Sequence, residues 1–315
     1  MELPGTYKNG NYIVKLLPDG TKVRETDENE FIPAFAESCD CKITDRCDGG
    51  CPYCYEGCTP EGRHGDILQY KFLDTLHPYT ELAINGNDMS HPDLVPFLCK
   101  LKEKRVIVNM TVNQIHFEKY QELICELVDR KLIYGLGISL KVPTEQFIAQ
   151  VKRYPNAVIH VINGVLTRCD VERLSDNNLK LLILGYKTLR RGDVWYSEEY
   201  ENITERQNWL KVSLPDIISH FQVVSFDNLA LEQLGVKEWM DEEKWSEFYM
   251  GDDGNYTFYL DLVEGSFAGN SLTSYRYPLM EHIDDMFRKQ KGEYHYGKKD
   301  CEYEYLACEQ KREGL

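Results

Sequence analysis

The sequence predicts an α/β fold in which strand–helix units follow one another and build a parallel sheet. Six short apolar segments have the length and composition of buried strands, at 39–44, 81–85, 106–112, 133–140, 157–162 and 179–184. Apolar residues recur at helical spacing between them, as in Leu94, Phe97, Leu98 and Leu101. Because consecutive parallel strands are joined by right-handed crossovers, we expect the six units to curl into a full or partial barrel.

The segments on either side of this series predict smaller additions. Pro18-Asp19-Gly20 lies between two β-prone runs, which indicates an N-terminal hairpin. Helices are expected at 193–220 and 227–250, and further strands at 221–226 and 256–263. We therefore divide the chain into a hairpin and linker at 1–37, a core at 38–226, and a mixed α+β extension at 227–315 that packs on the core.

The composition narrows the class of protein. The 315 residues are 42% hydrophobic and 28% charged, and they contain no apolar run long enough to span a membrane. The start of the chain lacks the basic and then apolar pattern of a signal peptide, so we expect a cytoplasmic protein without a membrane partner. The net charge of −16 disfavours non-specific binding to nucleic acid, which requires a basic surface.

The chemistry is expected to collect around three cysteines in the run Cys47-Asp48-Gly49-Gly50-Cys51-Pro52-Tyr53-Cys54. Their spacing is C-x3-C-x2-C, and they directly follow the first predicted core strand. Thiolates this close in sequence can converge on one soft metal centre, and iron–sulfur clusters are held by such short loops. The alternative is a structural zinc site, for which Cys58 or His64 would supply the fourth ligand.

Polar or small residues end each of the other five predicted strands. They are Asn85-Gly86-Asn87-Asp88, Thr111-Val112-Asn113, Ser139-Leu140-Lys141, Asn163-Gly164 and Gly185-Tyr186-Lys187. In parallel β/α folds the functional groups come from loops at the carboxyl ends of the strands. These segments are therefore expected to share one face of the fold with the cysteine loop.

The cysteine spacing and its β/α context resemble the radical S-adenosylmethionine (radical SAM) superfamily over about residues 39–190. The resemblance implies a partial (β/α)6, TIM-like barrel and a [4Fe-4S] cluster on Cys47, Cys51 and Cys54. SAM would chelate the open iron, and one electron would cleave it to a 5′-deoxyadenosyl radical that abstracts a substrate hydrogen. In this family the cofactor does the difficult step, and the protein orients it.

The resemblance also implies a set of SAM-binding residues. Tyr53 takes the aromatic position beside the adenine, and Asn85, Gly86, Asn87 and Asp88 take the place of the family's G-G-E-P motif. Asn87 stands where the family has Glu, and a neutral amide accepts a weaker hydrogen bond from an ammonium than a carboxylate does. The remaining predicted contacts lie at the ends of later strands: Thr111, Asn113, Ser139, Lys141, Gly185 and Tyr186.

The substrate, the electron donor and a possible auxiliary cluster of the predicted enzyme are considered in turn. The substrate is unidentified, with a peptide, protein or small metabolite favoured over nucleic acid. An oxygen-sensitive cluster would need an external electron donor of the flavodoxin or ferredoxin type. An auxiliary cluster would have to draw on Cys39, Cys41, Cys58, Cys301 or Cys308, and two distant C-terminal thiols are too few ligands. The rival class is a non-catalytic, zinc-bearing binding protein that uses the same cysteines.

Overall fold

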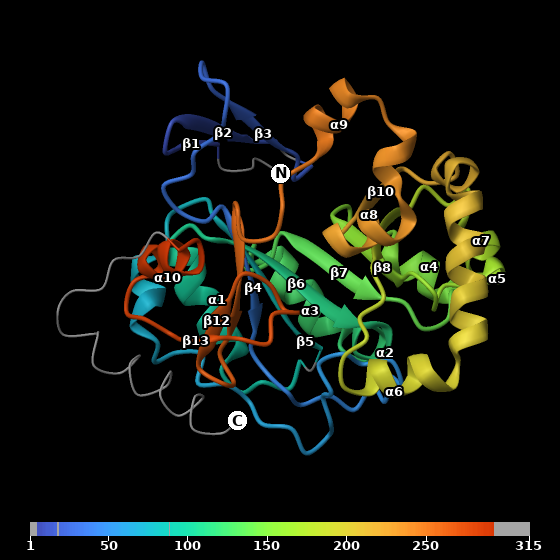
Figure 1. Ribbon diagram of the computed structural model, residues 1–315. Coiled ribbons are helices and arrows are strands. Elements are labelled where there is room, and N and C mark those ends of the chain that lie inside the picture. The colour runs from blue at the N-terminus through green and yellow to red at the C-terminus, as the bar shows by residue number, and fades with distance from the viewer. Residues whose placement is uncertain (1–4, 18, 88, 293–315) are drawn as a thin grey trace, which may run out of the picture.

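The computed structural model describes residues 5–17, 19–87 and 89–292, without the side chains of residues 86 and 87. Within these residues the strands form a three-stranded and a ten-stranded sheet (Figure 1). The strands of the larger sheet are β4 (Ser38–Lys42), β5 (Glu81–Asn87), β6 (Ile107–Asn113), β7 (Gly135–Ser139), β8 (Ala157–Ile162), β9 (Lys180–Leu184), β10 (Val223–Phe226), β11 (Thr257–Asp261), β12 (Ser266–Ala268) and β13 (Tyr277–Pro278).

The larger sheet confirms an α/β fold built on a large parallel sheet. Its order is β10-β9-β8-β7-β6-β5-β4-β11-β12-β13, and every pairing from β10 to β11 is parallel. The six predicted strands are neighbours in chain order, as short crossovers require. The sheet is open, with edges at β10 and β13, so the described strands do not close into a barrel.

The segment after the core joins the same sheet. β11 pairs in parallel with β4, on the side away from β5, and β12 and β13 then continue antiparallel. The first core strand is therefore central, with neighbours on both sides. The residues predicted as an extension thus supply three strands of the main sheet.

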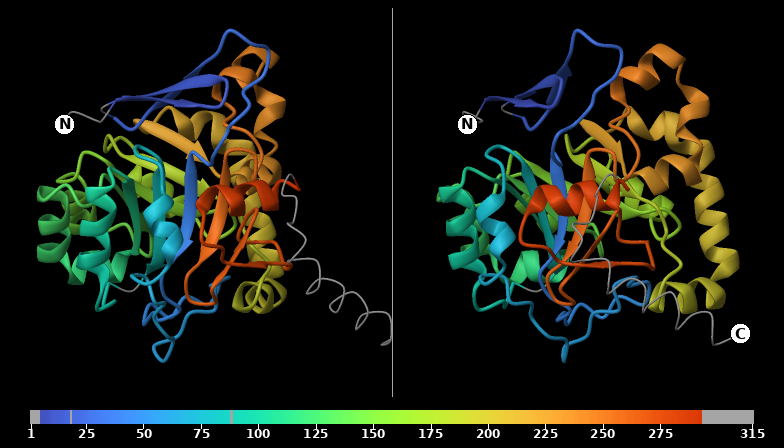
Figure 2. Two further views of the ribbon diagram at one scale, coloured as in Figure 1. Left: turned by 90° about the vertical axis from the view of Figure 1, so that its left-hand side faces the viewer. Right: turned by 60° about the vertical axis from the view of Figure 1, so that its left-hand side comes forward.

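Helices cover the outer face of the sheet (Figure 2). The helices of the described residues are α1 (Leu94–Glu103), α2 (Gln114–Lys119), α3 (Gln121–Asp129), α4 (Glu145–Val151), α5 (Arg168–Leu174), α6 (Arg191–Glu198), α7 (Tyr200–Ile218), α8 (Asn228–Leu234), α9 (Glu242–Phe248) and α10 (Ile283–Gln290), with 3-10 turns η1 (Lys71–Thr75) and η2 (Val236–Trp239). Of these, α9 lies beside the small N-terminal sheet (Figure 1). The predicted apolar stripe of α1 is buried at all four positions. The predicted helix at 193–220 is divided into α6 and α7 at Glu199.

The predicted N-terminal hairpin is β2 (Tyr12–Leu16) with β3 (Lys22–Glu25), and β1 (Thr6–Asn9) adds a third strand. This small sheet lies over the amino ends of the main strands (Figure 1). The buried face of β2 packs against Ile107, the first residue of β6. Glu37 is 1% exposed and fixes the contact, because Arg24 Nε and Lys22 Nζ lie 2.8 and 3.2 Å from its carboxylate.

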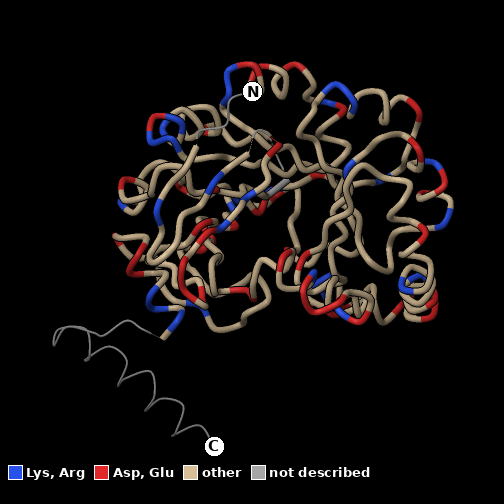
Figure 3. Tube along the Cα trace, turned by 90° about the horizontal axis from the view of Figure 1, so that it is seen from above, with Lys and Arg blue, Asp and Glu red and all other residues tan. Residues whose placement is uncertain are grey.

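The surface carries both signs of charge. Figure 3 shows Lys and Arg interleaved with Asp and Glu around the molecule. None of the helices in the described part of the chain is long and apolar enough to cross a membrane.

Candidate active site

The cysteine loop leaves the carboxyl end of β4. Two isolated bridges, Thr44 with His64 and Arg46 with Thr59, close the base of the loop. Cys47 is buried within it, and Cys51 and Cys54 are half-buried. The loop that follows β4 therefore carries all three thiols.

Cys47 is held by the end of another strand. Its Sγ accepts hydrogen bonds from Gly49 N (3.4 Å) and from Asn113 Nδ2 (3.5 Å). Asn113 ends β6 and also caps α2, because its Oδ1 accepts from His116 N at 2.9 Å. His116 is buried and contacts the Asp48 carboxylate through Nε2, and this contact lowers the pKa of Asp48. β6 and α2 thus fix the first half of the loop.

Lys141 holds the same half from the next strand. Its Nζ donates to Gly49 O at 2.9 Å, and its backbone N–H donates to Gln114 Oε1 at 2.8 Å. Asn113 and Lys141 were both predicted to contact SAM. In the structure they contact the cysteine loop, and neither borders the large cavity beside it.

Cys54 has a different environment. The Cys58 thiol donates a hydrogen bond that lowers the pKa of Cys54 to about 5, Arg191 acts in the same direction, and burial opposes both. Burial raises the pKa of Tyr53, and its hydrogen bond with Cys51 adds to the effect. Cys54 is therefore the thiol most readily available as a thiolate, the form that binds metals.

The donor set fits an iron–sulfur cluster in its chemistry, since three thiols lie in one loop and thiolates suit such clusters. The same structure places no group of three or more His, Cys, Asp or Glu residues, among those described, in position to hold a metal ion. The Cys47 and Cys54 sulfurs instead have the local partners given above.

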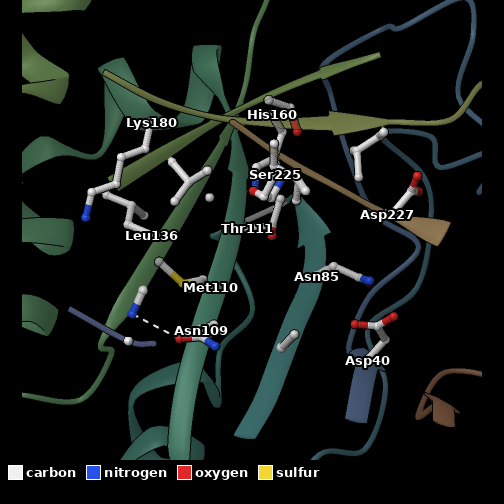
Figure 4. Close-up of a pocket in the computed structure, with 18 of the residues that line it drawn as sticks. Asp40, Asn85, Asn109, Met110, Thr111, Leu136, His160, Lys180, Ser225 and Asp227 are labelled. Atoms are coloured by element: carbon white, nitrogen blue, oxygen red, sulfur yellow. Dashed lines mark hydrogen bonds between the residues drawn. The ribbon is translucent and has the colours of Figure 1, made fainter. Parts of the chain in front are cut away.

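A cavity of about 750 Å³ lies next to the loop, on the inner face of the sheet. Side chains from β4 through β10 line it, so the sheet curves around it (Figure 4). Its walls include Tyr53, Cys54, Tyr55 and Glu56 from the cysteine loop. This volume lies within the range of small-molecule sites.

Several predicted SAM-binding residues border this cavity, namely Tyr53, Asn85, Thr111, Ser139, Gly185 and Tyr186. The buried Oδ1 of Asn85 accepts no hydrogen bond from the described part of the protein. An unpaired buried acceptor is costly, so Asn85 is suited to a ligand donor. Gly86 and Asn87 continue β5, and Asp88 lies outside the described residues.

An aromatic wall stands at the end of β9. The ring centroids of Tyr53 and Tyr186 lie 5.4 and 6.2 Å from that of Trp195. Gln233 holds Tyr186 by accepting from its N–H and donating to its carbonyl, both at 2.9 Å. Gly185 has no room for a side chain, since a Cβ would lie 2.4 Å from Leu229 Cγ. Tyr53 is half-buried and borders the cavity, so its ring can receive a planar ligand group, whereas the ring of Tyr186 is buried against Trp195.

The sequence pattern did not point to three titratable residues that line the cavity. Asp40 on β4, His160 on β8 and Asp227 after β10 all face the cavity (Figure 4). The available signal was a charged or polar residue within an otherwise apolar strand, as at His160. Orientation toward the cavity follows from the curvature of the sheet, which the sequence pattern does not specify.

A buried ion cluster lies under the second half of the loop. Lys42 is 1% exposed, and its Nζ lies 2.5 Å from Asp45, 3.1 Å from Glu56 and 3.5 Å from Asp261. Arg276 adds a second cation 3.1 Å from Asp261. The cluster ties the loop to the carboxyl ends of β4 and β11.

Comparison with known proteins identifies the fold. No protein-family model matches the chain, and no curated protein matches it. A solved structure, that of SuiB from Streptococcus suis bound to S-adenosylmethionine, matches with a TM-score of 0.52 and 13% sequence identity. The match covers 78% of this chain and 64% of SuiB, so the chain spans less than two thirds of that protein. The chain therefore shares the fold of a protein that has been crystallised with SAM.

Proposed function

We propose that this protein is a radical SAM enzyme whose partial barrel holds a [4Fe-4S] cluster on Cys47, Cys51 and Cys54. The observation that carries the proposal is the position of the three-cysteine loop. It follows the first core strand and borders a cavity that extends to the carboxyl ends of the parallel strands. The fold is shared with SuiB, whose crystal structure contains SAM.

A [4Fe-4S] cluster held by Cys47, Cys51 and Cys54 would supply the one electron needed to cleave SAM to methionine and a 5′-deoxyadenosyl radical, which would abstract a hydrogen atom from the substrate. The chain's own contribution is positioning. Asn113 and Lys141 act on the cysteine loop through Cys47 and Gly49, and Lys42 anchors its second half through Glu56. Hydrogen bonds to cluster sulfurs are one of the means by which proteins set reduction potential.

SAM would lie in the part of the cavity nearest the loop. Tyr53 offers an aromatic face for the adenine, Tyr186 a backbone contact on the same side, and Asn85 an unpaired acceptor. The other proposed contacts are Gly86, Asn87, Asp88, Thr111, Ser139 and Gly185. Enclosure by strands and loop would keep water from a reactive species.

The substrate class and partners follow as part of the proposal. The enzyme would work in the cytoplasm with an external flavodoxin- or ferredoxin-like electron donor and would be sensitive to oxygen. Its substrate would be a peptide, protein or small metabolite, in keeping with a net charge of −16.

Anaerobic reconstitution with iron and sulfide tests the cluster assignment. We expect about four irons per chain and visible cluster absorbance, both lost when Cys47, Cys51 and Cys54 are replaced together by alanine. The matched control replaces the exposed Cys125 and Cys169, which should leave the iron content unchanged. Equal iron binding by the two variants would remove the basis of the proposal.

A second candidate is a non-catalytic zinc protein. The hydrogen bond between Cys58 and Cys54 favours it, because it places a fourth thiol beside the motif. His64 is less suited, since its Nδ1 lies 2.9 Å from Thr44 Oγ1. Zinc without iron after anaerobic purification, with loss of zinc in Cys58→Ser, would favour this candidate.

A further inference from the structure

One wall of the cavity carries a carboxylate without a partner among the described residues. Asp40 lies in the middle of β4 and faces the cavity, whereas its neighbours Cys39 and Cys41 are buried on the opposite face. Asp40 makes no hydrogen bond or ion pair with the residues that the structure describes. Its side chain is exposed to the cavity, so a charged ligand group can reach it.

Asp227 is a second acidic group on this side of the cavity (Figure 4). Its Oδ1 accepts two backbone N–H groups, from Gly185 and Ala230, both at 2.8 Å. No hydrogen bond within the described residues involves its other oxygen, Oδ2. Asp227 therefore adds acceptor capacity to the wall that carries Asp40.

The cations of the cavity are already engaged. Lys187 is the cation that most affects Asp40, and its Nζ donates to Ser271 Oγ at 3.1 Å and lies 4.2 Å from the Tyr55 ring centroid. Lys180 Nζ donates to the Pro155 carbonyl at 3.0 Å. Burial raises the pKa of Asp40. The nearby cation of Lys187 lowers this pKa, and the carboxylates of Asp253 and Asp227 raise it. The wall around Asp40 thus carries more negative than positive charge.

The facing wall carries a neutral polar group. His160 projects from β8 into space left by Gly137, where a Cβ would lie 2.4 Å from His160 Cε1 and 2.9 Å from Thr111 Oγ1. Burial lowers the pKa of His160 to about 4, so the ring is neutral at pH 7 and offers one donor and one acceptor. Like Asp40, it has no hydrogen-bond partner in the described residues.

We propose that this part of the cavity binds a substrate group with a positively charged nitrogen, an ammonium or guanidinium, through Asp40 and Asp227, while His160 contacts its polar body. This inference rests on the proposed function, because it names the substrate class of that site. A cation would pair with the carboxylate of Asp40, whereas an anion would be repelled by it. The volume of about 750 Å³ leaves room for a small amine or one basic side chain of a peptide.

Calorimetric titration of the full-length, anaerobically reconstituted protein in the presence of SAM tests the charge preference. The probes are 1,4-diaminobutane, the neutral 1,4-butanediol, the anionic succinate, and Nα-acetyl-lysine methylamide. We expect both amines to bind at least tenfold more tightly than the diol, and succinate not to bind. Tighter binding of 1,4-diaminobutane would indicate a free amine as the natural ligand, and tighter binding of Nα-acetyl-lysine methylamide would indicate a basic side chain of a peptide. Equal binding of amine, diol and succinate overturns the proposal.

The Asp40→Asn variant tests whether the carboxylate of Asp40 binds the amine. It keeps the shape of the side chain and removes the charge, so we expect amine affinity to fall at least tenfold with SAM affinity unchanged. The matched control is Asp19→Asn, which removes a carboxylate at the amino-terminal end of the same cavity and should leave amine affinity unchanged. Equal amine affinities for the two variants, or a loss confined to SAM binding in Asp40→Asn, contradicts the proposal.

The experiments distinguish failure of the amine-binding proposal from failure of the radical SAM proposal. A protein that cleaves SAM but does not prefer amines keeps the proposed function and loses this inference. A protein that binds amines through Asp40 but assembles no cluster loses the radical SAM function.

Discussion

Asn113 Nδ2 donates to Cys47 Sγ at 3.5 Å, although the two residues lie 66 positions apart in the chain. Asn113 ends β6, and Cys47 follows β4, two strands away in the sheet. The same side chain caps α2. The sheet order, the start of a helix and the first thiol of the motif are therefore coupled through one amide.

The first prediction concerns this amide. Asn113→Ala removes an N-cap and a hydrogen bond to the first sulfur, so we expect about 1 kcal/mol lower unfolding free energy and a more negative cluster potential. The control is Thr144→Ala, which removes the equivalent cap of α4, where Thr144 accepts from Phe147 N, far from the cysteines. Chemical denaturation and a redox titration measure both quantities. A potential shift of the same size in both variants would show that Asn113 acts only through stability.

The second prediction concerns the buried ion cluster. Lys42→Met leaves Asp45, Glu56 and Asp261 without their shared cation, and we expect a loss of about 3–5 kcal/mol in unfolding free energy. Lys71→Met is the matched control, because its pair with Glu281 is 73% and 71% exposed and should contribute about 0–1 kcal/mol. Urea denaturation distinguishes them. Similar midpoints for the two variants would contradict the assignment of a structural role to Lys42.

The third prediction concerns Glu37 and pH. Burial raises the pKa of Glu37, but Lys22, Arg24 and Tyr12 outweigh this effect and hold it below 4.5. A carboxylate whose pKa is depressed by folding stabilises the protein above its unfolded pKa and loses that contribution as pH falls through its folded value. We expect the hydrogen-exchange protection of β2 and β3, measured against the intrinsic exchange rate at each pH, to fall below about pH 4.5.

Substitution of Glu37 distinguishes its own contribution from the effect of protonating other carboxylates at low pH. Glu37→Gln leaves two cations without their anion, so it should accelerate exchange in β2 and β3 already at pH 7. Glu25→Gln is the control, since the Lys15–Glu25 pair is 46% and 52% exposed. Exchange at pH 7 that is unchanged in Glu37→Gln would show that the network does not hold the N-terminal sheet.

The fourth prediction concerns the stability cost of Asp40. A carboxyl whose pKa folding raises destabilises the protein once pH exceeds the unfolded value near 3.8, and the cost persists at neutral pH. Asp40→Asn should therefore raise the melting temperature at pH 7, though only slightly because the side chain is exposed to solvent, and leave it nearly unchanged at pH 3. Thermal unfolding at the two pH values measures this. A melting temperature lowered at pH 7 would mean that Asp40 has an internal partner.

The parts of the fold that depend on local pattern were predictable from the sequence. All six predicted strands form, because each is a short apolar run bounded by polar turns, and the buried stripe of α1 follows the spacing of its leucines and phenylalanine. Glu199 has no comparable signal, so the division between α6 and α7 was not predicted.

The parts that depend on distant contacts were not predictable. β11 pairs with β4 across more than 200 residues of sequence, and only the choice of partner makes β4 a central strand. Asn113 and Lys141 were placed at the correct strand ends, but their side chains contact the loop and do not border the cavity. The direction of a side chain at a strand end depends on the loop that packs on it. Asp40 and His160 were not predicted as site residues, because the curvature of the sheet decides which side chains face the cavity.

The most direct test of the central claim is the formation of 5′-deoxyadenosine. The reconstituted protein is mixed with SAM and dithionite without oxygen, and the product is quantified by chromatography. We expect dithionite-dependent 5′-deoxyadenosine from the wild type and from Cys169→Ala, and none from Cys47→Ala, Cys51→Ala or Cys54→Ala. Wild-type protein that carries an intact cluster but forms no 5′-deoxyadenosine under these conditions would contradict the account.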